Sequence, residues 1–282
     1  MLAVIEQVFE ALMEGYLEKV PYARQAIKII QGKNDSFVND HVAFRSFGMP
    51  NLGIASLEKP FIHLGYTKME RMYFEDMKLN AYWYRPPHLS LPKVFISELI
   101  VSLFPESTQS VIKKYTDPIE SDPNDQISIA EPDKIIEYLD SRPWAQPSYA
   151  DYQSLNEASE YAAWVLAYGN RVNHFTISVN ALANISNIQA LNDLLLENEI
   201  PMNTAGGLIK GSPAACLMQS STVANQMEVE FLDGTHSIPY SYMEFAERFV
   251  EPQYYFQGFI PKNADMIFES TYAAQVNKTN PT

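Results

Sequence analysis

A histidine-centred pattern occurs twice in this 282-residue chain, and it constrains the fold more than any other feature. Asp40-His41-Val42-Ala43-Phe44 and Asn173-His174-Phe175-Thr176-Ile177 both read polar, histidine, apolar, small, apolar, with the two histidines 133 residues apart. Side chains alternate between the faces of a strand, so each pattern is typical of a buried strand whose histidine lies on one face. The two segments are therefore predicted to be equivalent strands of two related halves.

The first pattern continues to Arg45, which is expected on the same face as His41 because an even number of residues separates them. At about 3.3 Å per residue, the two positions are roughly 13 Å apart. A metal on His41 and the guanidinium fork of Arg45 would suit the two ends of a small acid. Taken alone, the pattern is more typical of a capped strand histidine and a surface arginine. The second histidine strand shifts the interpretation toward a metal site.

The order of the expected elements is the same in both halves. In the first half, the His41 strand precedes a helical pattern over 51–64 and three strands between 66 and 101. In the second half, the His174 strand precedes a helix over 185–199. Three further strands are then expected at 217–222, 227–232 and 238–246. The pattern predicts an α+β fold made of two βαβββ halves.

We expect a single domain in which two pseudo-repeats, residues 37–104 and 170–250, carry the sheet. Helices are predicted over residues 1–31, where apolar residues recur at helical spacing. The segment 105–168 is rich in proline, aspartate and tyrosine and is interpreted as an insertion that bridges the halves. Residues 251–282 form a C-terminal tail.

Composition excludes several classes of function. The net charge of −14 makes nucleic acid and anionic membranes poor partners, so an anionic substrate needs a local positive centre such as a metal or a buried arginine. The sequence contains no run of about 18 apolar residues, so we expect no membrane span. The single cysteine, Cys216, excludes an internal disulfide and a cysteine-based metal cluster. The first residues lack the features of a signal peptide, so we expect a cytoplasmic protein.

Two histidines and one carboxylate on strand faces form the facial triad that holds non-haem Fe(II) with open positions. His41, His174 and Glu244 are the predicted ligands, because Glu244 lies on the closing strand of the second half. Glu98 lies on the closing strand of the first half and is either a fourth ligand or a nearby base. Glu230 alternates with apolar residues, as on a solvent-facing strand, and is the main rival to Glu244.

Several segments resemble the 2-oxoadipate dioxygenase/decarboxylase family, and the resemblance runs from about residue 37 to residue 272. The segments that carry it are Asp40–Arg45, Lys93–Leu99, Gly169–Thr176, Gln219–Ala224, Tyr242–Arg248 and Asn263–Thr271.

The resemblance implies a vicinal-oxygen-chelate-like fold, in which a central sheet or half-barrel surrounds Fe(II) and helices flank it. It also implies conversion of 2-oxoadipate and O2 into 2-hydroxyglutarate and CO2, a reaction of lysine catabolism in bacterial members. His41, His174 and Glu244 take the metal positions. Arg45 takes the position that binds a substrate carboxylate. Apart from the resemblance, we expect Arg45 and Glu98 as catalytic residues and Gln219 as a second substrate contact.

Two other interpretations stay open. A metal-dependent lyase of the glyoxalase or epimerase kind would keep the fold, use Glu98 as base and need four protein ligands without oxygen. A non-catalytic module that binds a small acid would keep the pocket without a working metal. Oxygen uptake on addition of a 2-oxo acid separates the first alternative from the dioxygenase, and absence of bound metal favours the second.

Overall fold

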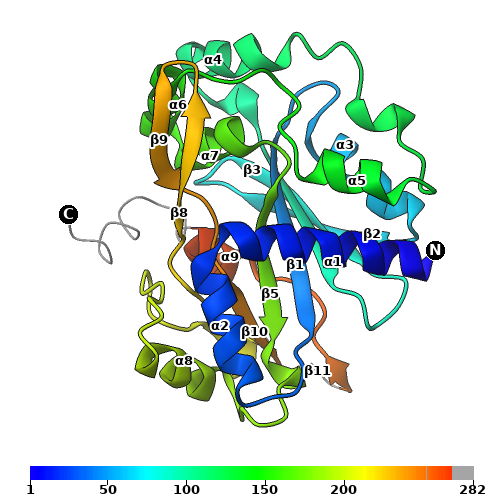
Figure 1. Ribbon diagram of the computed structural model, residues 1–282, viewed down its shortest axis with the longest axis vertical. Coiled ribbons are helices and arrows are strands. Elements are labelled where there is room, and N and C mark those ends of the chain that lie inside the picture. Colours follow the sequence, from blue (N-terminus) through cyan, green and yellow to red (C-terminus); the bar gives the residue numbers. More distant parts are fainter. Residues whose placement is uncertain (252, 269–282) are drawn as a thin grey trace. The chain divides into compact units, whose positions relative to one another are not determined.

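The computed structural model describes residues 1–251 and 253–268, and Figure 1 labels their elements. The chain forms two compact units, each with its own set of strands and helices. The first unit comprises Met1–Tyr16, Ala43–Asn173 and Met227–Ile238, and the second comprises Leu17–Val42, His174–Gln226 and the residues from Pro239 onward. Strand β1 (Asn39–Phe47) begins in the second unit and ends in the first.

Four strands of the first unit are hydrogen-bonded in the order β2-β3-β4-β1. The three besides β1 are β2 (Thr67–Phe74), β3 (Leu79–Arg85) and β4 (Lys93–Leu99). They form an antiparallel meander, in which the polar turn 75–78 connects β2 to β3 and the proline-containing loop 86–92 connects β3 to β4. A separate hairpin, β8 (Gln226–Phe231) with β9 (Gly234–Pro239), turns at the predicted Asp233-Gly234 pair.

The helices of the first unit cover apolar residues of these strands. They are α1 (Leu2–Lys19, to residue 16), α3 (Gly53–His63), α4 (Glu106–Thr116), α5 (Pro132–Leu139), α6 (Tyr149–Ala158) and α7 (Glu160–Tyr168). An aromatic cluster joins three of the elements: the Phe61 ring of α3 lies 5.5 Å from Phe44 of β1 and 6.2 Å from Phe9 of α1. Helix α7 is buried along its whole length, so it is the central helix of this unit.

The second unit continues the strand order as β1-β5-β10-β7-β6. Its strands are β5 (Val172–Ser178), β6 (Lys210–Ser212), β7 (Leu217–Ser221), β10 (Glu244–Arg248) and the short pair β11 (Val250–Glu251) and β12 (Tyr254–Tyr255). Its helices are α2 (Pro21–Gln31), α8 (Ile188–Glu197) and α9 (Pro261–Phe268). Helix α8 lies against β10 and β7, where its Leu191 and Leu195 are fully buried (Figure 1).

The two strand orders repeat one βαβββ plan, as the sequence predicts. In each half, the first strand (β1 or β5) carries a histidine and lies beside the last strand of that half (β4 or β10). The second half reaches this plan by a different route from the expected one. The predicted strand over 227–232 pairs with β9 in a separate hairpin and is not part of this sheet. The short strand β6 supplies the third strand of the half after β5 instead.

The predicted strand over 238–246 is not continuous: residues 238–239 belong to β9, residues 244–246 belong to β10, and residues 240–243 between them are not in a strand. Pro239 cannot donate to a strand partner, and it ends β9. The residues that follow pair instead with a loop: Tyr240 N donates to Asn225 O, and Asn225 N donates to Ser241 O. These bonds satisfy the buried backbone without a strand. Helix α6, which the sequence did not indicate, begins at Tyr149 and has Ser148 as its N-cap, whose Oγ accepts a hydrogen bond from Asp151 N.

Within the described residues, no helix is long and apolar enough to cross a membrane. The mixed α+β class is confirmed by the elements above. The description of the chain as one domain with two pseudo-repeats stays a prediction. The predicted tail lies partly outside the described residues, which end at residue 268.

Candidate metal centre

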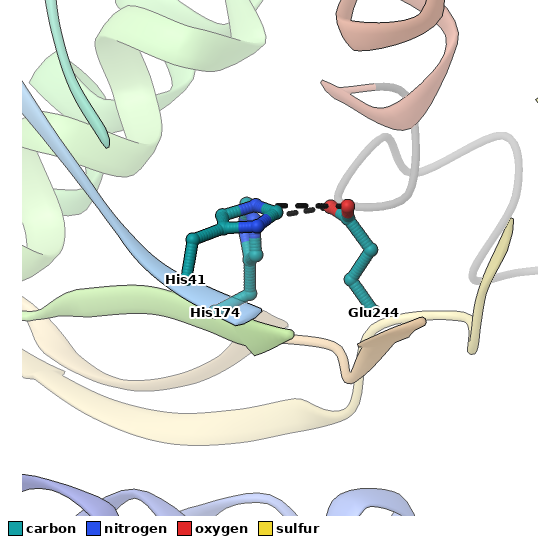
Figure 2. Close-up of side chains that lie close together, drawn as sticks. All are labelled: His41, His174 and Glu244. Atoms are coloured by element: carbon teal, nitrogen blue, oxygen red, sulfur yellow. Dashed lines mark ion pairs between the residues drawn. The ribbon is translucent and has the colours of Figure 1, made fainter. Parts of the chain in front are cut away.

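His41, His174 and Glu244 form one buried cluster in the second unit (Figure 2). One ligand atom from each residue lies within 4.8 Å of the others. His174 Nε2 lies 3.1 Å from Glu244 Oε2, and His41 Nε2 lies 3.6 Å from Glu244 Oε1. All three residues are at most 5% exposed, so the cluster is closed to bulk water. The structure thus brings together the three residues predicted as ligands.

The sheet places these residues. β1, β5 and β10 are successive neighbours, and each contributes one member of the cluster. Strand β10 runs parallel to β5, with Glu244 opposite Thr176, and antiparallel to β7, with Glu244 opposite Ser221. His174 precedes Thr176 by two residues, so its side chain lies on the same face one pleat away. Figure 2 shows both imidazoles rising from adjacent strands toward the Glu244 carboxylate.

The orientation of His41 is fixed from both ring nitrogens. Its Nδ1 lies 2.8 Å from Asp40 Oδ1, and its Nε2 lies 3.0 Å from Thr176 Oγ1. A carboxylate accepts only, so Nδ1 donates to Asp40, and Nε2 is the ring nitrogen that faces the cluster. The sequence pattern places Asp40 beside a buried histidine but did not assign it this contact.

The Glu244 carboxylate is anionic. Burial raises the pKa of Glu244, but the neighbouring His41 and His174 and a hydrogen bond from Gln219 outweigh burial and bring this pKa below its ordinary value. Gln219 Nε2 donates to Glu244 Oε1 at 2.6 Å. The predicted contact of Gln219 with a substrate is a separate role and stays a prediction.

Aromatic rings line the cluster. The His174 ring is stacked on Tyr242 with 4.7 Å between centroids, and the Phe259 ring meets the His41 ring edge-on at 4.8 Å. Tyr242 and Phe259 were not singled out in the sequence, because aromatic residues are common in any core and give no local signal of a site.

The cluster fits a divalent metal ion. Two ligand atoms that are each about 2.1 Å from a metal and about 90° apart lie about 3.0 Å from each other. The separations of 3.1 Å (His174 Nε2 to Oε2) and 3.6 Å (His41 Nε2 to Oε1) are close to that value but involve different oxygens of Glu244. One ligand atom per residue spans up to 4.8 Å, so a bound metal would draw the three side chains slightly closer together. Two imidazole nitrogens and one carboxylate can therefore occupy three adjacent positions on one metal, which leaves the other positions open.

Arg45 belongs to the first unit and is 1% exposed, so the alternative of a surface arginine is wrong. Its guanidinium lies over the rings of Tyr161 and Trp164, with centroid distances of 5.1 Å and 5.3 Å. Stacking on two rings of helix α7 holds the planar group in place. Its predicted contact with a substrate carboxylate is untested by these distances and stays a prediction.

Glu98 is half-buried in the first unit and has a structural role that the sequence did not indicate. Its Oε2 accepts a hydrogen bond from Ile54 N at 2.9 Å, at the first turn of α3. It also lines a pocket of about 260 Å³ that includes Asn80, Gln109 and Lys113. Among the described residues, the group that could hold a metal ion consists of His41, His174 and Glu244, without Glu98. A catalytic role of Glu98 stays a prediction.

The rival ligand Glu230 is exposed on strand β8, where its apolar neighbours Val229 and Phe231 are buried. This is the solvent-facing alternation that the sequence indicated.

The profile of the 2-oxoadipate dioxygenase/decarboxylase family matches residues 8–254, which is most of the chain. The chain belongs to this family.

Two curated relatives share this description. A chloroplastic 2-oxoadipate dioxygenase/decarboxylase of Arabidopsis thaliana is 39% identical over 93% of this chain and 76% of its own length. A chloroplastic/amyloplastic one of Oryza sativa subsp. japonica is 37% identical over 96% of this chain and 79% of its own length. The location in these names belongs to the plant proteins, and the predicted cytoplasmic location of this family member stays a prediction.

Solved structures extend the likeness to three dimensions. The crystal structure of hydroxyglutarate synthase from Oryza sativa, in complex with 2-oxoadipate, is 35% identical with a TM-score of 0.87, over 96% of this chain and 93% of that chain. A glyoxalase-superfamily structure from Ralstonia eutropha, 19% identical over 91% of this chain and 85% of its own, has a TM-score of 0.76 and shows the fold alone. The predicted vicinal-oxygen-chelate-like class is confirmed.

Proposed function

We propose that this chain is an Fe(II)-dependent dioxygenase/decarboxylase of a 2-oxo dicarboxylic acid, with 2-oxoadipate as substrate. The observation that carries the proposal is the buried cluster of His41, His174 and Glu244 in a member of this family. Two neutral nitrogen ligands and one carboxylate are the donor set of non-haem Fe(II) enzymes, and they leave positions for a substrate and O2.

The overall reaction balances without a second cosubstrate. 2-Oxoadipate and O2 contain the same atoms as 2-hydroxyglutarate and CO2. The C1 carboxyl leaves as CO2, the ketone carbon C2 becomes the new carboxylate, and the neighbouring CH2 becomes CHOH. Each of the two carbon oxidations removes two electrons, and together they supply the four that reduce O2. When bound, Fe(II) supplies the O2 activation and the oxidation chemistry.

The residues of the chain supply orientation and exclusion of water. Asp40 keeps His41 in the tautomer that directs Nε2 toward the cluster, and Gln219 restrains the Glu244 carboxylate. Burial of all three ligand residues keeps bulk water from the reacting atoms. We also propose that Arg45, four residues after His41 along β1, pairs with a substrate carboxylate and selects diacids. Its support on Tyr161 and Trp164 favours this role over that of a mobile charge.

Oxygen consumption is the direct test. Apoprotein reconstituted with Fe(II) under anaerobic conditions is mixed with a series of 2-oxo monoacids and diacids, and oxygen uptake is recorded. We expect uptake with 2-oxoadipate, equimolar release of CO2, and 2-hydroxyglutarate as product. With ¹⁸O2, one labelled atom is expected in the new carboxylate, one in the hydroxyl, and none in released CO2.

A conversion of substrate without oxygen uptake would favour the lyase alternative. The His174→Ala protein serves as the inactive control, and the His63→Ala protein, which changes an exposed histidine of α3, serves as the matched active control.

A further inference from the structure

Two hydrogen-bonded chains of buried side chains lead outward from the metal centre. The first starts at His41, whose Nδ1 contacts Asp40. Both Asp40 oxygens accept hydrogen bonds from Arg248: Nε donates to Oδ2 at 2.6 Å and Nη2 donates to Oδ1 at 2.8 Å. The remaining guanidinium nitrogen, Nη1, donates to the carbonyls of Phe256 at 3.1 Å and Gly258 at 2.7 Å.

The second chain starts at Glu244. Gln219 Nε2 donates to the Glu244 carboxylate, and Gln219 Oε1 accepts a hydrogen bond from Asn263 Nδ2 at 3.2 Å. Asn263 Nδ2 also lies 3.3 Å from Leu217 O, which ties it to strand β7. Gln219 and Asn263 are 3% and 4% exposed, so bulk water does not compete for the hydrogen bonds of this second chain.

Both chains end on one segment, residues 256–263, which we call the anchoring segment: the first ends on two of its backbone carbonyls and the second on the Asn263 side chain. It follows β12 and includes the first residues of α9. The same segment also places Phe259 edge-on against His41, and the Arg248 guanidinium lies 5.4 Å from the Phe259 ring centroid. Three independent contacts therefore connect a short segment after β10 to two of the three ligand residues.

The chemistry of the contacts suits positioning rather than packing alone. A carboxylate on the outer nitrogen of a ligating histidine fixes the tautomer, the ring orientation and the basicity of the inner nitrogen. Arg248 presents a planar fork with fixed donor directions, so its pairing with Asp40 depends on where the two carbonyls hold the fork. Arg248 lies four residues after Glu244 on β10, on the same face, so one strand supplies a ligand and the support of another ligand.

We propose that the anchoring segment fixes the geometry of the metal centre, with Asp40 and Arg248 as positioning residues for His41, and Gln219 and Asn263 as positioning residues for Glu244. The inference rests on the proposed function only in that a divalent metal occupies the cluster. Loss of an outer partner of a metal ligand typically costs about 10–100-fold in metal affinity. We expect losses of that size from changes that leave all three ligand residues in place.

The test measures metal binding without turnover. Co²⁺ is titrated into apoprotein against a competing chelator, and its visible absorption spectrum reports the ligand geometry. The variants are Arg248→Lys, which keeps the charge but loses the fork, and Asn263→Ala, which removes the donor to Gln219. The matched control is Arg142→Lys, because Arg142 is a partly buried arginine of the first unit that also donates to a backbone carbonyl. Thermal midpoints of the apoproteins report folding separately.

We expect both variants to bind Co²⁺ about 10–100-fold more weakly than the unchanged protein, with an altered spectrum, while Arg142→Lys keeps the original affinity and spectrum. If Arg248→Lys does not fold, Asn263→Ala and Phe259→Leu decide the question by the same two measurements. Folded variants with the affinity and spectrum of the unchanged protein would overturn the inference. Equal Co²⁺ binding by the unchanged protein and by His41→Ala would instead overturn the metal centre itself.

Discussion

Glu98 offers a prediction whose size follows from the contacts of one carboxylate. Helix α3 has Leu52 at its N-cap, and Leu52 has no side-chain oxygen to accept from the first turn. Glu98 of β4 supplies that acceptor at 2.9 Å from Ile54 N. Gly53 has a positive φ of 71°, and a Cβ atom there would lie 2.5 Å from Glu98 Oε2. The glycine therefore leaves the space that the carboxylate uses.

The expected cost of losing this carboxylate combines two effects. Loss of a capping acceptor costs about 0.5–2 kcal/mol, and loss of a negative charge at a helix N-terminus costs about 0.3–1 kcal/mol. The Asn80 contact at 3.4 Å is long and contributes little. Because Glu98 is only half-buried, we expect Glu98→Ala to lower the free energy of unfolding by about 1–2 kcal/mol. Glu98→Gln keeps an acceptor oxygen and loses the charge, so about 0.3–1 kcal/mol is expected.

Thermal unfolding of metal-free protein measures both changes. At about 2–4 °C per kcal/mol for chains of this size, Glu98→Ala is expected to lower the midpoint by about 2–8 °C, and Glu98→Gln by less. Glu120→Ala, which removes an exposed carboxylate of the same unit, is the control and should stay within about 1 °C. Equal midpoints for Glu98→Ala and the unchanged protein would refute the capping role. Turnover per folded molecule of Glu98→Gln separately tests the catalytic role predicted from the sequence.

Three further predictions concern the metal, the substrate and the fold. His174→Ala should abolish metal retention, measured by elemental analysis, while circular dichroism stays unchanged; retained metal would place the site elsewhere. Arg45→Lys should keep metal binding but lower kcat/KM for 2-oxoadipate by roughly thirty- to several-thousand-fold, because an unpaired buried carboxylate costs about 2–5 kcal/mol, and near-normal kcat/KM in Arg45→Ala would make Arg45 structural. Gly169→Ala should destabilise by more than about 2 kcal/mol in urea unfolding, since φ is +68° and the new Cβ would lie 2.5 Å from Arg142 Cα; Gly32→Ala, with φ of −65°, should cost far less.

The ligand residues could be predicted because strand patterns are local. A histidine in an alternating apolar segment marks a buried face, and two such segments with a shared element order indicate two halves of one plan. His41 and His174 meet this criterion, Glu244 was chosen for its place near the end of the second half, and the structure brings the three side chains together. The break after Pro239 was missed because Tyr240, Tyr242 and Met243 are all buried, so their apolar character is the same as in a strand.

The surroundings of the ligands could not be predicted in the same way. Arg248 meets Asp40 across 208 positions of sequence, and Asn263 meets Gln219 across 44. Neither pair has a local period or a turn signal, because only the tertiary packing of the strands and of helix α9 in the second unit brings the partners together. Glu98 is a further case: it was predicted from the sequence as a fourth ligand or a nearby base, and its contact with a helix N-terminus is one that no pattern names.

The order in which the chain is synthesised gives the parallel pairing of β10 with β5 a consequence for assembly. His41 leaves the ribosome early, whereas Glu244, Arg248 and Asn263 are made more than 200 positions later. Domains fold as their segments emerge, and contacts of high sequence separation form late because loop closure must precede them. The cluster around His41 therefore stays incomplete until Glu244 has been made. If a metal occupies the cluster as proposed, its binding by all three residues must follow the synthesis of Glu244, which makes it a late event in maturation.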